Sequence, residues 1–525
     1  MGLYINTGNE AFRSSRKSEY VDKSGLIAVV NETLGTRNRF SCVSRCRRFG
    51  KSMAAEMLAA YYDKSCDSLD LFSDLAIAQD ASFKEHLNQY PVVYLDITGF
   101  IARFKDESIV SQIDEVLTAD IQAAYPQVGF QEVDDLMGSL IRIAAETGER
   151  FIFIIDEWDA ICREFPAESS AMSRYVDWLR RMFKDAAAQN VFAGVYMTGI
   201  LPIKKYNTQS ALNNFQEYSI VDPRRMARFF GFTRDEVKVL AAKYGMDFDE
   251  LEKWYDGYCV GNEKSMFNPN SVIQALDSEW CTSYWGKTAA YDAIVPYIQM
   301  NFEGLKDDII DMLSGGRCPV NPSGFQNDLS IVNNRDDVLT VLIHLGYLSY
   351  DREQGECFIP NREVAEEMLF AVRDSNWRYV TGAIEKSRNL LKATLEGDEQ
   401  AVASGVDAVH DENTSILSYN NENSLACVLS LAYYYARNDY ILHRELAPGK
   451  GFADLVLIPR KNVASPAIVV ELKYNQSADT AIDQILRKEY PAKVAQYAGN
   501  LLLVGINYDK KTKTHSCRIV NQAAH

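Results

Sequence analysis

The sequence predicts an α/β protein, and three observations lead to that prediction. Residues 40–43 form a short apolar run that leads through an Arg-rich turn into a helical pattern of apolar residues. Residues 151–155 form a second apolar run that ends in two acids, as buried strands of a parallel sheet do. Near the C-terminus, two further strand-like segments flank a turn with two prolines, which is typical of an antiparallel hairpin. We therefore expect a parallel-sheet region followed by a second α/β region.

The length and composition of the chain fit several folded domains. It has 525 residues, of which 47% are hydrophobic and 24% are charged. That is enough for roughly two to four domains, each with its own core. Changes in pattern along the chain predict three regions, at residues 1–221, 222–375 and 376–525.

Charge and cysteine usage narrow the class of protein. The formal net charge of -17 argues against a protein that coats nucleic acid through bulk charge, so any contact with DNA or RNA requires a local basic patch. The ten cysteines are scattered without metal-binding spacing, which indicates reduced thiols and no structural zinc. No apolar run approaches the ~18 residues that span a bilayer, and the N-terminus lacks a signal-peptide core. We expect a cytoplasmic protein with no membrane partner.

A phosphate-binding loop is predicted after the first apolar run. The turn ends in Gly50, Lys51 and Ser52, immediately before the helical pattern. Backbone N–H groups at a helix N-terminus bind anions; Lys51 would reach the β- and γ-phosphates of a nucleotide, and the Ser52 hydroxyl would ligate Mg²⁺. Arg45 stands where the pattern GxxxxGK[ST] expects its first glycine. An ordinary basic turn between a strand and a helix is the alternative.

The second apolar run places two acids where ligands bind in parallel sheets. Asp156 would hold the Mg²⁺ shell, and Glu157 is placed to orient or deprotonate an attacking water. The alternative is that both acids simply open the next helix. Thr198 ends a third apolar run, at residues 191–197, and is a candidate sensor of the γ-phosphate, although Thr-Gly turns are common for local reasons.

The order of these segments favours an ATPase over a GTPase switch. A strand-like segment at residues 92–96 lies between the lysine loop and Asp156 in the sequence. Together with Glu157, it favours the branch of P-loop proteins that has an inserted strand and a catalytic glutamate.

The middle of the chain is predicted to be helical, with a winged-helix-like lid. Thr233 and Glu236 form a capping-box pattern, and a helix near residues 336–345 precedes a hairpin around residue 355. The hairpin region lacks clustered basic residues, so a packing or lid role is preferred to DNA binding. The aromatic segment at residues 254–258 could stack on bases, but buried packing is the more frequent role. The arginine-finger candidates, among which the sequence does not choose, are Arg224, Arg225 and Arg228.

The C-terminal hairpin contains the sharper chemical pattern. If its turn is symmetric about the prolines at 459 and 466, Asp454 lies directly opposite Glu471, with Cβ atoms roughly 4.5–5.5 Å apart. Lys473 lies two residues beyond Glu471 and therefore on the same face. Opposed like charges destabilise a sheet unless a cation compensates, so a shared Mg²⁺ explains the pair. A solvent-facing hairpin with alternating charges is the alternative.

Residues outside the hairpin add to this pattern. Glu422 begins a helical run and would complete a set of metal ligands. Gln484 and Lys488 lie one helical turn apart after the hairpin and could contact a phosphate backbone, although both are also ordinary surface residues.

Several motifs together resemble the AAA-ATPase-like family of prokaryotic proteins, whose C-terminal part is a PD-(D/E)XK nuclease-like domain. The motifs are YVDKSGLI, SRCRRFGKS, FIFIIDEWDA, YMTGILPIKKYNTQSALNNF, RFFGFTRDEV and WYDGYCVG. The resemblance implies ATP and Mg²⁺ as ligands, held by Arg48, Gly50, Lys51, Ser52 and Asp156. Cys46 stands where the family often has proline, which changes turn rigidity more than chemistry.

The C-terminal motifs GFADLVLIP, VVELKY and DQILRKEY resemble the PD-(D/E)XK nuclease-like fold. Asp454, Glu471 and Lys473 match its core motif, and Glu422 and Gln484 match its flanking helices. All core positions are present.

These patterns predict an ATP-dependent protein with a Mg²⁺-dependent phosphodiesterase domain that acts on DNA, or less favourably on RNA. In this interpretation ATP turnover gates or moves the nuclease, with Glu157, Asp454, Glu471 and Lys473 as catalytic residues. The competing hypothesis is an NTP-controlled regulatory module whose nuclease-like fold binds a partner without cutting it. Whether the chain forms a homo-oligomer stays open.

Overall fold

The structure is a computed structural model of the whole chain. It describes residues 2–104, 106–165, 169–203, 205–206, 209–210, 212–285, 296–297, 300, 302–313, 315–325, 332–374, 378–413, 429, 432–433, 436, 440–444, 454–459, 465–487 and 500–523. Its contacts divide the chain into two compact units. The first comprises Met1–Asp308 and Arg317–Met368, and the second comprises Ile309–Gly316 and Leu369–His525.

A five-stranded parallel sheet forms the centre of the first unit. Its spatial order is β2-β3-β4-β1-β7. The strand bounds are Phe40–Ser44 for β1, Val92–Asp96 for β2, Phe151–Asp156 for β3, Phe192–Gly199 for β4 and Gln216–Tyr218 for β7. Strands β1, β3 and β4 are buried along their whole length, as their apolar runs predict for a sheet covered on both faces.

The position of the inserted strand differs from the sequence-based expectation. The strand between β1 and β3 is β4, whereas the strand at residues 92–96 pairs with the outer side of β3. Strand order in a sheet is set by long-range pairing and not by order along the chain, so the sequence did not reveal which strand is inserted. The consequence for the site is that Thr198, at the end of β4, becomes the direct neighbour of the acids on β3.

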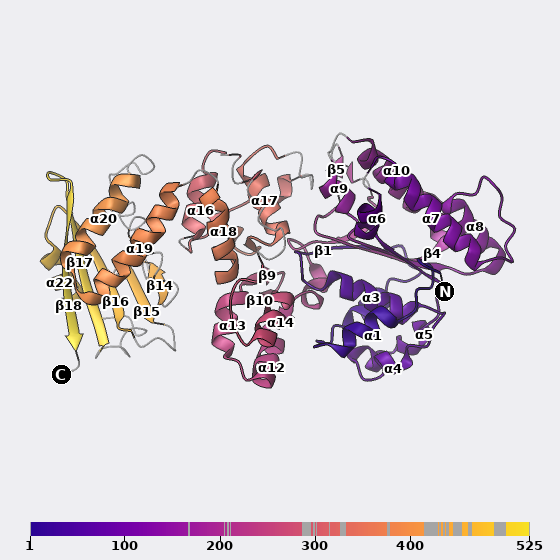
Figure 1. The fold of residues 1–525 in the computed structure, drawn as a ribbon, viewed down its shortest axis with the longest axis horizontal. Helices are drawn as coiled ribbons and strands as arrows, with labels where there is room; N and C mark the ends of the chain where they lie inside the picture. The colour runs from indigo at the N-terminus through magenta and orange to yellow at the C-terminus, as the bar shows by residue number, and fades with distance from the viewer. Residues whose placement is uncertain are drawn as a thin grey trace. The chain divides into compact units, whose positions relative to one another are not determined.

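Helices cover both faces of this sheet (Figure 1). One face carries α7 (Ile109–Ala124), α8 (Leu136–Thr147) and α10 (Ser170–Lys184), whose apolar side chains share a single core with β1 to β4. The other face is contacted by α3 (Lys51–Tyr62), with α1 (Glu10–Lys17) packed against α3. The smaller elements of this region are α2 (Gly25–Asn31), α4 (Leu69–Phe72), η1 (Ala76–Gln79), α5 (Phe83–His86), α6 (Ile97–Arg103), α9 (Ala160–Glu164), α11 (Ala188–Val191), β5 (Lys205–Tyr206), β6 (Gln209–Ser210) and η2 (Arg224–Phe229).

The remainder of the first unit is helical with two small sheets. The capping box predicted at Thr233 and Glu236 is present at the start of α12. Trp254, Tyr255 and Tyr258 are buried, which confirms packing as the role of this aromatic segment. The elements are β8 (Phe232–Thr233), α12 (Arg234–Tyr244), α13 (Phe248–Tyr255), β9 (Tyr258–Val260), β10 (Glu263–Phe267), α14 (Pro269–Ser278), β11 (Cys318–Pro319) and η4 (Pro322–Gly324). Helix α16 (Leu305–Leu313) begins in the first unit and ends in the second.

A helix followed by a hairpin confirms the winged-helix-like pattern in this region. Helix α17 (Arg335–Leu345) precedes β12 (Ser349–Asp351) and β13 (Glu356–Phe358), and the sheet order is β11-β13-β12. Helix α18 (Arg362–Asp374) follows this hairpin.

The second unit is a mixed five-stranded sheet with helices on both faces. The order β14-β15-β16-β17-β18 is antiparallel except for the parallel pair β16–β17. The strands are β14 (Tyr440–Arg444), β15 (Leu455–Pro459), β16 (Ala467–Tyr474), β17 (Asn500–Asp509) and β18 (Thr514–Ala523). Helices α19 (Arg378–Glu396) and α20 (Glu399–Asn413) pack on one face. Helix α22 (Ala478–Arg487) packs on the other face.

Within the described residues, no helix is both long and apolar enough to cross a membrane.

Candidate functional site

The predicted phosphate loop connects β1 to α3 and has an unusual backbone. Arg48 has a φ of 67° and Gly50 a φ of 84°, both in the left-handed region. Glycine adopts this conformation without steric cost, whereas Arg48 requires support from its surroundings. Part of that support is a hydrogen bond of 2.8 Å that the Arg48 guanidinium donates to the carbonyl of Tyr284. The loop is therefore fixed by a contact far away in the sequence.

Lys51 lies between this loop and the acids of β3. It is only 4% exposed, its Nζ donates to the carbonyl oxygen of Cys46 at 3.1 Å, and it lies 3.5 Å from Glu157 Oε1. Ser52, the next residue, is exposed at the start of α3. The ammonium group is thus held at the loop by two oxygens, in the region where a triphosphate would bind.

Asp156 ends β3 as a buried carboxyl group with hydroxyl partners. The Thr198 hydroxyl donates to its Oδ1, and the Tyr94 hydroxyl donates to its Oδ2 at 3.4 Å. Burial raises the pKa of Asp156, while hydrogen bonds from Thr198 and Ser52 oppose the rise. A divalent cation would compensate the buried charge, so this donor set fits Mg²⁺.

Glu157 is held by two positively charged side chains. Its backbone has a φ of 52°, and its carboxylate pairs with both Lys51 and Arg163. Arg163 also contacts buried Asp159 at 3.1 Å, and Asp159 accepts hydrogen bonds from the N–H groups of Ile200 and Leu201 just after β4. Sequence reasoning missed Arg163 and Asp159, although their i,i+4 spacing was a usable signal.

Arg45 fills the position where the motif expects glycine, and it is fully buried. Its guanidinium donates to the carbonyl oxygens of Ser44, Tyr218 and Met226, at 2.8, 2.7 and 3.3 Å. Burial lowers the pKa of Arg45 to about 10. Arg45 therefore connects the loop to β7 and η2 instead of facing a ligand.

Two of the three arginine-finger candidates pair with acids of the same unit. Arg224 contacts Asp222, and Arg225 contacts Glu32.

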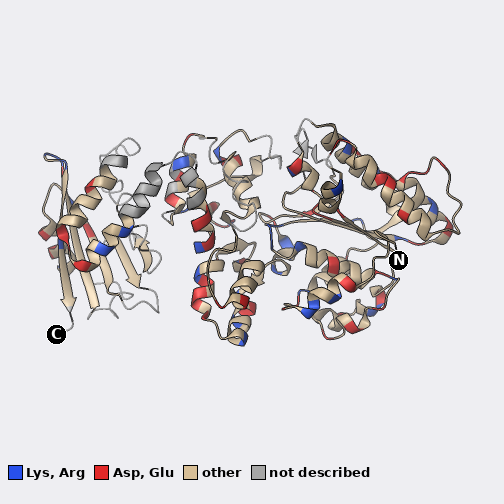
Figure 2. Cartoon of the chain, viewed as in Figure 1, with Lys and Arg blue, Asp and Glu red and all other residues tan. Residues whose placement is uncertain are grey.

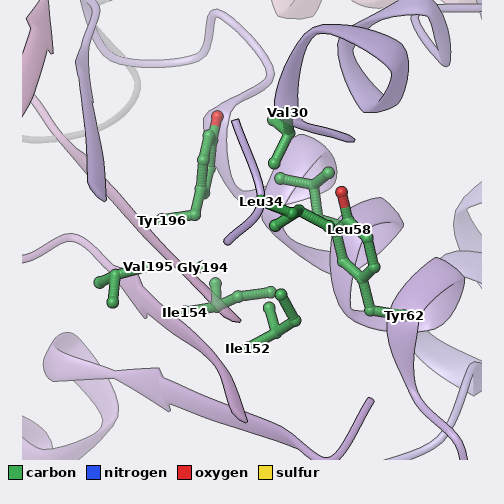
Figure 3. Close-up of a pocket in the computed structure, with 9 residues that line it drawn as sticks. All are labelled: Val30, Leu34, Leu58, Tyr62, Ile152, Ile154, Gly194, Val195 and Tyr196. Atoms are coloured by element: carbon green, nitrogen blue, oxygen red, sulfur yellow. The ribbon is translucent and has the colours of Figure 1, made fainter. Parts of the chain in front are cut away.

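A small apolar cavity lies between the central sheet and helices α2 and α3 (Figure 3). Its volume is about 10 Å³, which is close to that of a single water-sized probe. The lining residues are Val30, Leu34, Leu58, Tyr62, Ile152, Ile154, Gly194, Val195 and Tyr196. It is too small for a nucleotide and offers no charged group.

The C-terminal hairpin has the register that the sequence predicts. Leu455 pairs with Val470 and Val456 with Val469, so the same register places Asp454 opposite Glu471. Val456 and Val469 both pack in the core under α22, and period-two alternation puts Asp454 and Glu471 on that same face. The Asp454 carboxylate accepts a hydrogen bond of 2.6 Å from the N–H of Leu472.

Glu471 is surrounded by the other predicted residues of this site. It is 3% exposed, Lys473 Nζ lies 3.0 Å from its Oε1, and the Gln484 amide donates to the same oxygen. The structure therefore brings Glu471, Lys473 and Gln484 together on one face. Two carboxylates on that face provide the oxygen ligands that Mg²⁺ prefers. Glu422 and Lys488 lie outside the described residues, within which no cluster of three or more metal-binding side chains occurs.

A glycine on β17 allows α22 to approach this face closely. A Cβ atom on Gly505 would lie 2.3 Å from the carbonyl oxygen of Ala478 and 3.0 Å from the Cβ of Ala481. Gly505 pairs directly with Glu471 across the parallel strands. The absence of a side chain there lets α22 come near enough for Gln484 to reach Glu471, which sequence reasoning did not identify.

Two family models each match a part of this chain. Residues 7–208 match a family model described as "Predicted AAA-ATPase", and residues 420–517 match the model of the PD-(D/E)XK nuclease superfamily. A protein of Azotobacter chroococcum mcd 1, described as an uncharacterized protein in the vnfD 5' region, is 28% identical over 290 residues. The alignment covers 54% of this chain and 53% of that protein, so the chain spans about half the length of this curated relative.

The solved structures that this chain resembles are distant from it in sequence. Cdc6p from Pyrobaculum aerophilum has a TM-score of 0.24 at 11% identity, with coverage of 67% of this chain and 93% of that chain. The ORC1 protein of Aeropyrum pernix, solved in complex with DNA, has a TM-score of 0.27 at 12% identity, with coverage of 71% and 97%. Similarity at these TM-scores supports no conclusion about the fold or the function of this chain.

Proposed function

We propose that this chain, in which an AAA-ATPase-like domain is followed by a domain of the PD-(D/E)XK nuclease superfamily, hydrolyses ATP and cleaves phosphodiester bonds in DNA. The observation that supports the nuclease most directly is the placement of Asp454 and Glu471 on one sheet face beside Lys473. We also propose that the chain has three domains, at residues 1–221, 222–375 and 376–525, and that the protein is cytoplasmic.

In the ATPase half, each residue around Asp156 would have a separate role toward a bound triphosphate and its Mg²⁺. Lys51 would exchange its contact with Cys46 for the β- and γ-phosphates, assisted by the N–H groups after Gly50. Ser52 and Asp156 would hold Mg²⁺, which supplies charge neutralisation when bound. Glu157 would orient the attacking water or accept its proton, and Thr198, bound to Asp156, would register the γ-phosphate.

In the hairpin site, the carboxylates are fixed before any substrate arrives. The Leu472 N–H orients Asp454, while Gln484 and Lys473 orient Glu471. Mg²⁺ bound there would lower the pKa of a water and neutralise charge on the scissile phosphate. Lys473 holds its positive charge on the same face, where it would position the nucleophile or stabilise the developing negative charge.

The test is cleavage of plasmid and single-stranded DNA by the full chain with Mg²⁺. Asp454→Asn and Lys473→Ala are expected to reduce nicking by about 10³ or more, because each removes a group that acts on the transition state. Asp479→Asn is the matched control, since Asp479 is an exposed acid on α22. Equal nicking by wild type and both variants would assign the activity to another site or to a contaminant.

A second function is favoured by one observation, the net charge of -17, which disfavours general affinity for nucleic acid. In that case the nuclease-like domain would bind a partner under NTP control without cutting it. An RNA panel tested beside DNA, with and without ATP, separates the two functions: DNA cleavage that changes with ATP supports the first. Binding without cleavage of any polynucleotide supports the second.

A further inference from the structure

We propose that the turn between β17 and β18, residues 509–514, is the surface on which the phosphate backbone of double-stranded DNA docks beside the hairpin site. The inference rests on the proposed nuclease function and adds the residues that hold the substrate. The turn presents Lys510, Lys511 and Lys513, which are all exposed. Figure 2 shows it in blue at the tip of the β17–β18 hairpin.

The register of the sheet puts this turn at the same edge as the hairpin site. Strands β16 and β17 are parallel, so their C-terminal ends lie together. Lys473 pairs with Asn507, and the first lysine of the turn, Lys510, follows three residues later. At ~3.3 Å per residue, the first lysine of the turn lies about 10 Å from the row that contains Lys473.

Two polar side chains hold the backbone of the turn by accepting hydrogen bonds from its N–H groups. Asp509 accepts hydrogen bonds from the N–H groups of Lys511 and Thr512, at 2.7 and 3.2 Å. Asn475, which follows β16, accepts a hydrogen bond of 2.8 Å from the N–H of Lys510. The only acid of the turn is therefore bound to backbone, and the turn is tied to the strand that contains Glu471.

Two other exposed cations of this unit, Lys392 and Arg518, are paired with acids, unlike these lysines. Lys392 lies 3.9 Å from Glu396, and Arg518 contacts Glu399 at 3.3 Å. Across the described part of the chain, Lys510, Lys511 and Lys513 have no ion pair. Three unneutralised charges within four residues are a local basic patch on a chain whose net charge is -17.

The chemistry of the patch identifies its partner. Lysine is a flexible point charge that suits phosphate groups, whereas base recognition favours the planar fork of arginine. The turn therefore fits the backbone of DNA and reads no sequence. A separation of about 10 Å corresponds to roughly three base steps, so the turn would hold phosphates a few nucleotides from the scissile bond.

The experiment neutralises the patch in the full chain with K510Q, K511Q and K513N together. Asparagine is used at 513 because Lys513 has a φ of 58°, a conformation that asparagine tolerates better than most residues. The charge-conserving control is the triple change of the same lysines to arginine, and Lys392→Gln is a control for an exposed lysine elsewhere in the unit. Binding of a fluorescein-labelled DNA duplex is measured over a salt series with Ca²⁺ in place of Mg²⁺, followed by cleavage with Mg²⁺.

The neutral variant is expected to bind at least about tenfold more weakly, and the slope of log K against log salt should fall in magnitude by about 2.7. The cleavage rate at saturating DNA should be unchanged, and the arginine variant should bind like wild type. Wild-type affinity and slope in the neutral variant would overturn the proposal, as would wild-type protein that binds no DNA. Tighter binding of an RNA duplex would overturn DNA as the partner. If wild type binds but never cuts while the neutral variant loses binding, the docking surface stands and the nuclease function fails.

Discussion

The phosphate-loop site and the hairpin site both place acids beside a lysine, but they assemble these groups differently. In the hairpin site, every described group lies within residues 454–484, and strand register alone brings Asp454 and Glu471 to one face. In the phosphate-loop site, Asp156 depends on Thr198 and Tyr94 from two other strands. The first site is therefore local in sequence, whereas the second depends on tertiary contacts. Mutations far away in the sequence should disturb the phosphate-loop site more.

Lys51→Ala gives the largest expected effect and tests the phosphate-loop site. Loss of the ammonium that contacts Cys46 and Glu157 should reduce ATP hydrolysis by about 10³, because this is the group expected to stabilise charge on the β- and γ-phosphates. Steady-state phosphate release measures the effect, with Lys64→Ala, two residues beyond the end of α3, as control. Unchanged hydrolysis would show that the phosphate loop does not act on ATP.

Arg45→Gly tests the tertiary dependence of the loop. Although the change restores the glycine of the GxxxxGK[ST] pattern, we expect it to lower the free energy of unfolding by about 3 kcal/mol. The carbonyl groups of Tyr218 and Met226 lose their buried donor, and a cavity replaces the side chain. Denaturant unfolding of the first unit measures it, with Arg47→Ala as control. A variant as stable as wild type would show that Arg45 is not the anchor.

Glu363 on α18 tests the same dependence through pH. Its carboxylate accepts a hydrogen bond from the N–H of Tyr284, the residue whose carbonyl holds Arg48. Burial raises the pKa of Glu363 from 4.5 to about 7. The folded state therefore keeps a proton that the unfolded state loses, and this contribution to stability disappears as the pH rises from about 4.5 through 7.

Glu363→Gln should therefore gain stability relative to wild type as the pH rises from 5 to 8, by up to about 3 kcal/mol. The melting temperature across this range measures the difference, with partly exposed Glu366→Gln on the same helix as control. A constant difference at all pH values would contradict the buried, protonated state of Glu363.

Gly505→Ala gives the smallest expected effect and tests the hairpin site. The added methyl group would meet the carbonyl oxygen of Ala478 and push α22 away from β17. We expect a loss of about 2 kcal/mol in stability and weaker DNA cleavage, because Gln484 moves away from Glu471. Gly129→Ala, where a methyl group meets nothing within 4 Å, is the control. Full activity in Gly505→Ala would show that α22 does not position Glu471.

The two sites also differ in how much of them the sequence could predict. Prolines 459 and 466 mark the two ends of the turn, and the period-two alternation of side chains determines which residues share a face of the sheet. The register of Asp454 and Glu471 was therefore predictable. The turn with Gly50, Lys51 and Ser52 between a strand and a helix was predictable from its motif, and phosphate binding there stays a prediction. The insertion of β4 was not predictable, since it depends on which strands pair in space. The contact of Arg163 with Glu157 was missed, although Arg163 lies one helical turn after Asp159. The lysines at residues 510–513 were visible in the sequence, but only the strand pairing shows that they lie at the same edge of the sheet as Lys473.

The central claim is that the chain holds two separate divalent cations, one at each acidic site. The most direct test is anomalous diffraction from crystals of the full chain with Mn²⁺ and a non-hydrolysable ATP analogue. The account predicts two peaks, one between Ser52 and Asp156 and another between Asp454 and Glu471. A single peak at the phosphate loop, with Asp454 and Glu471 free of metal at saturating Mn²⁺, would contradict it.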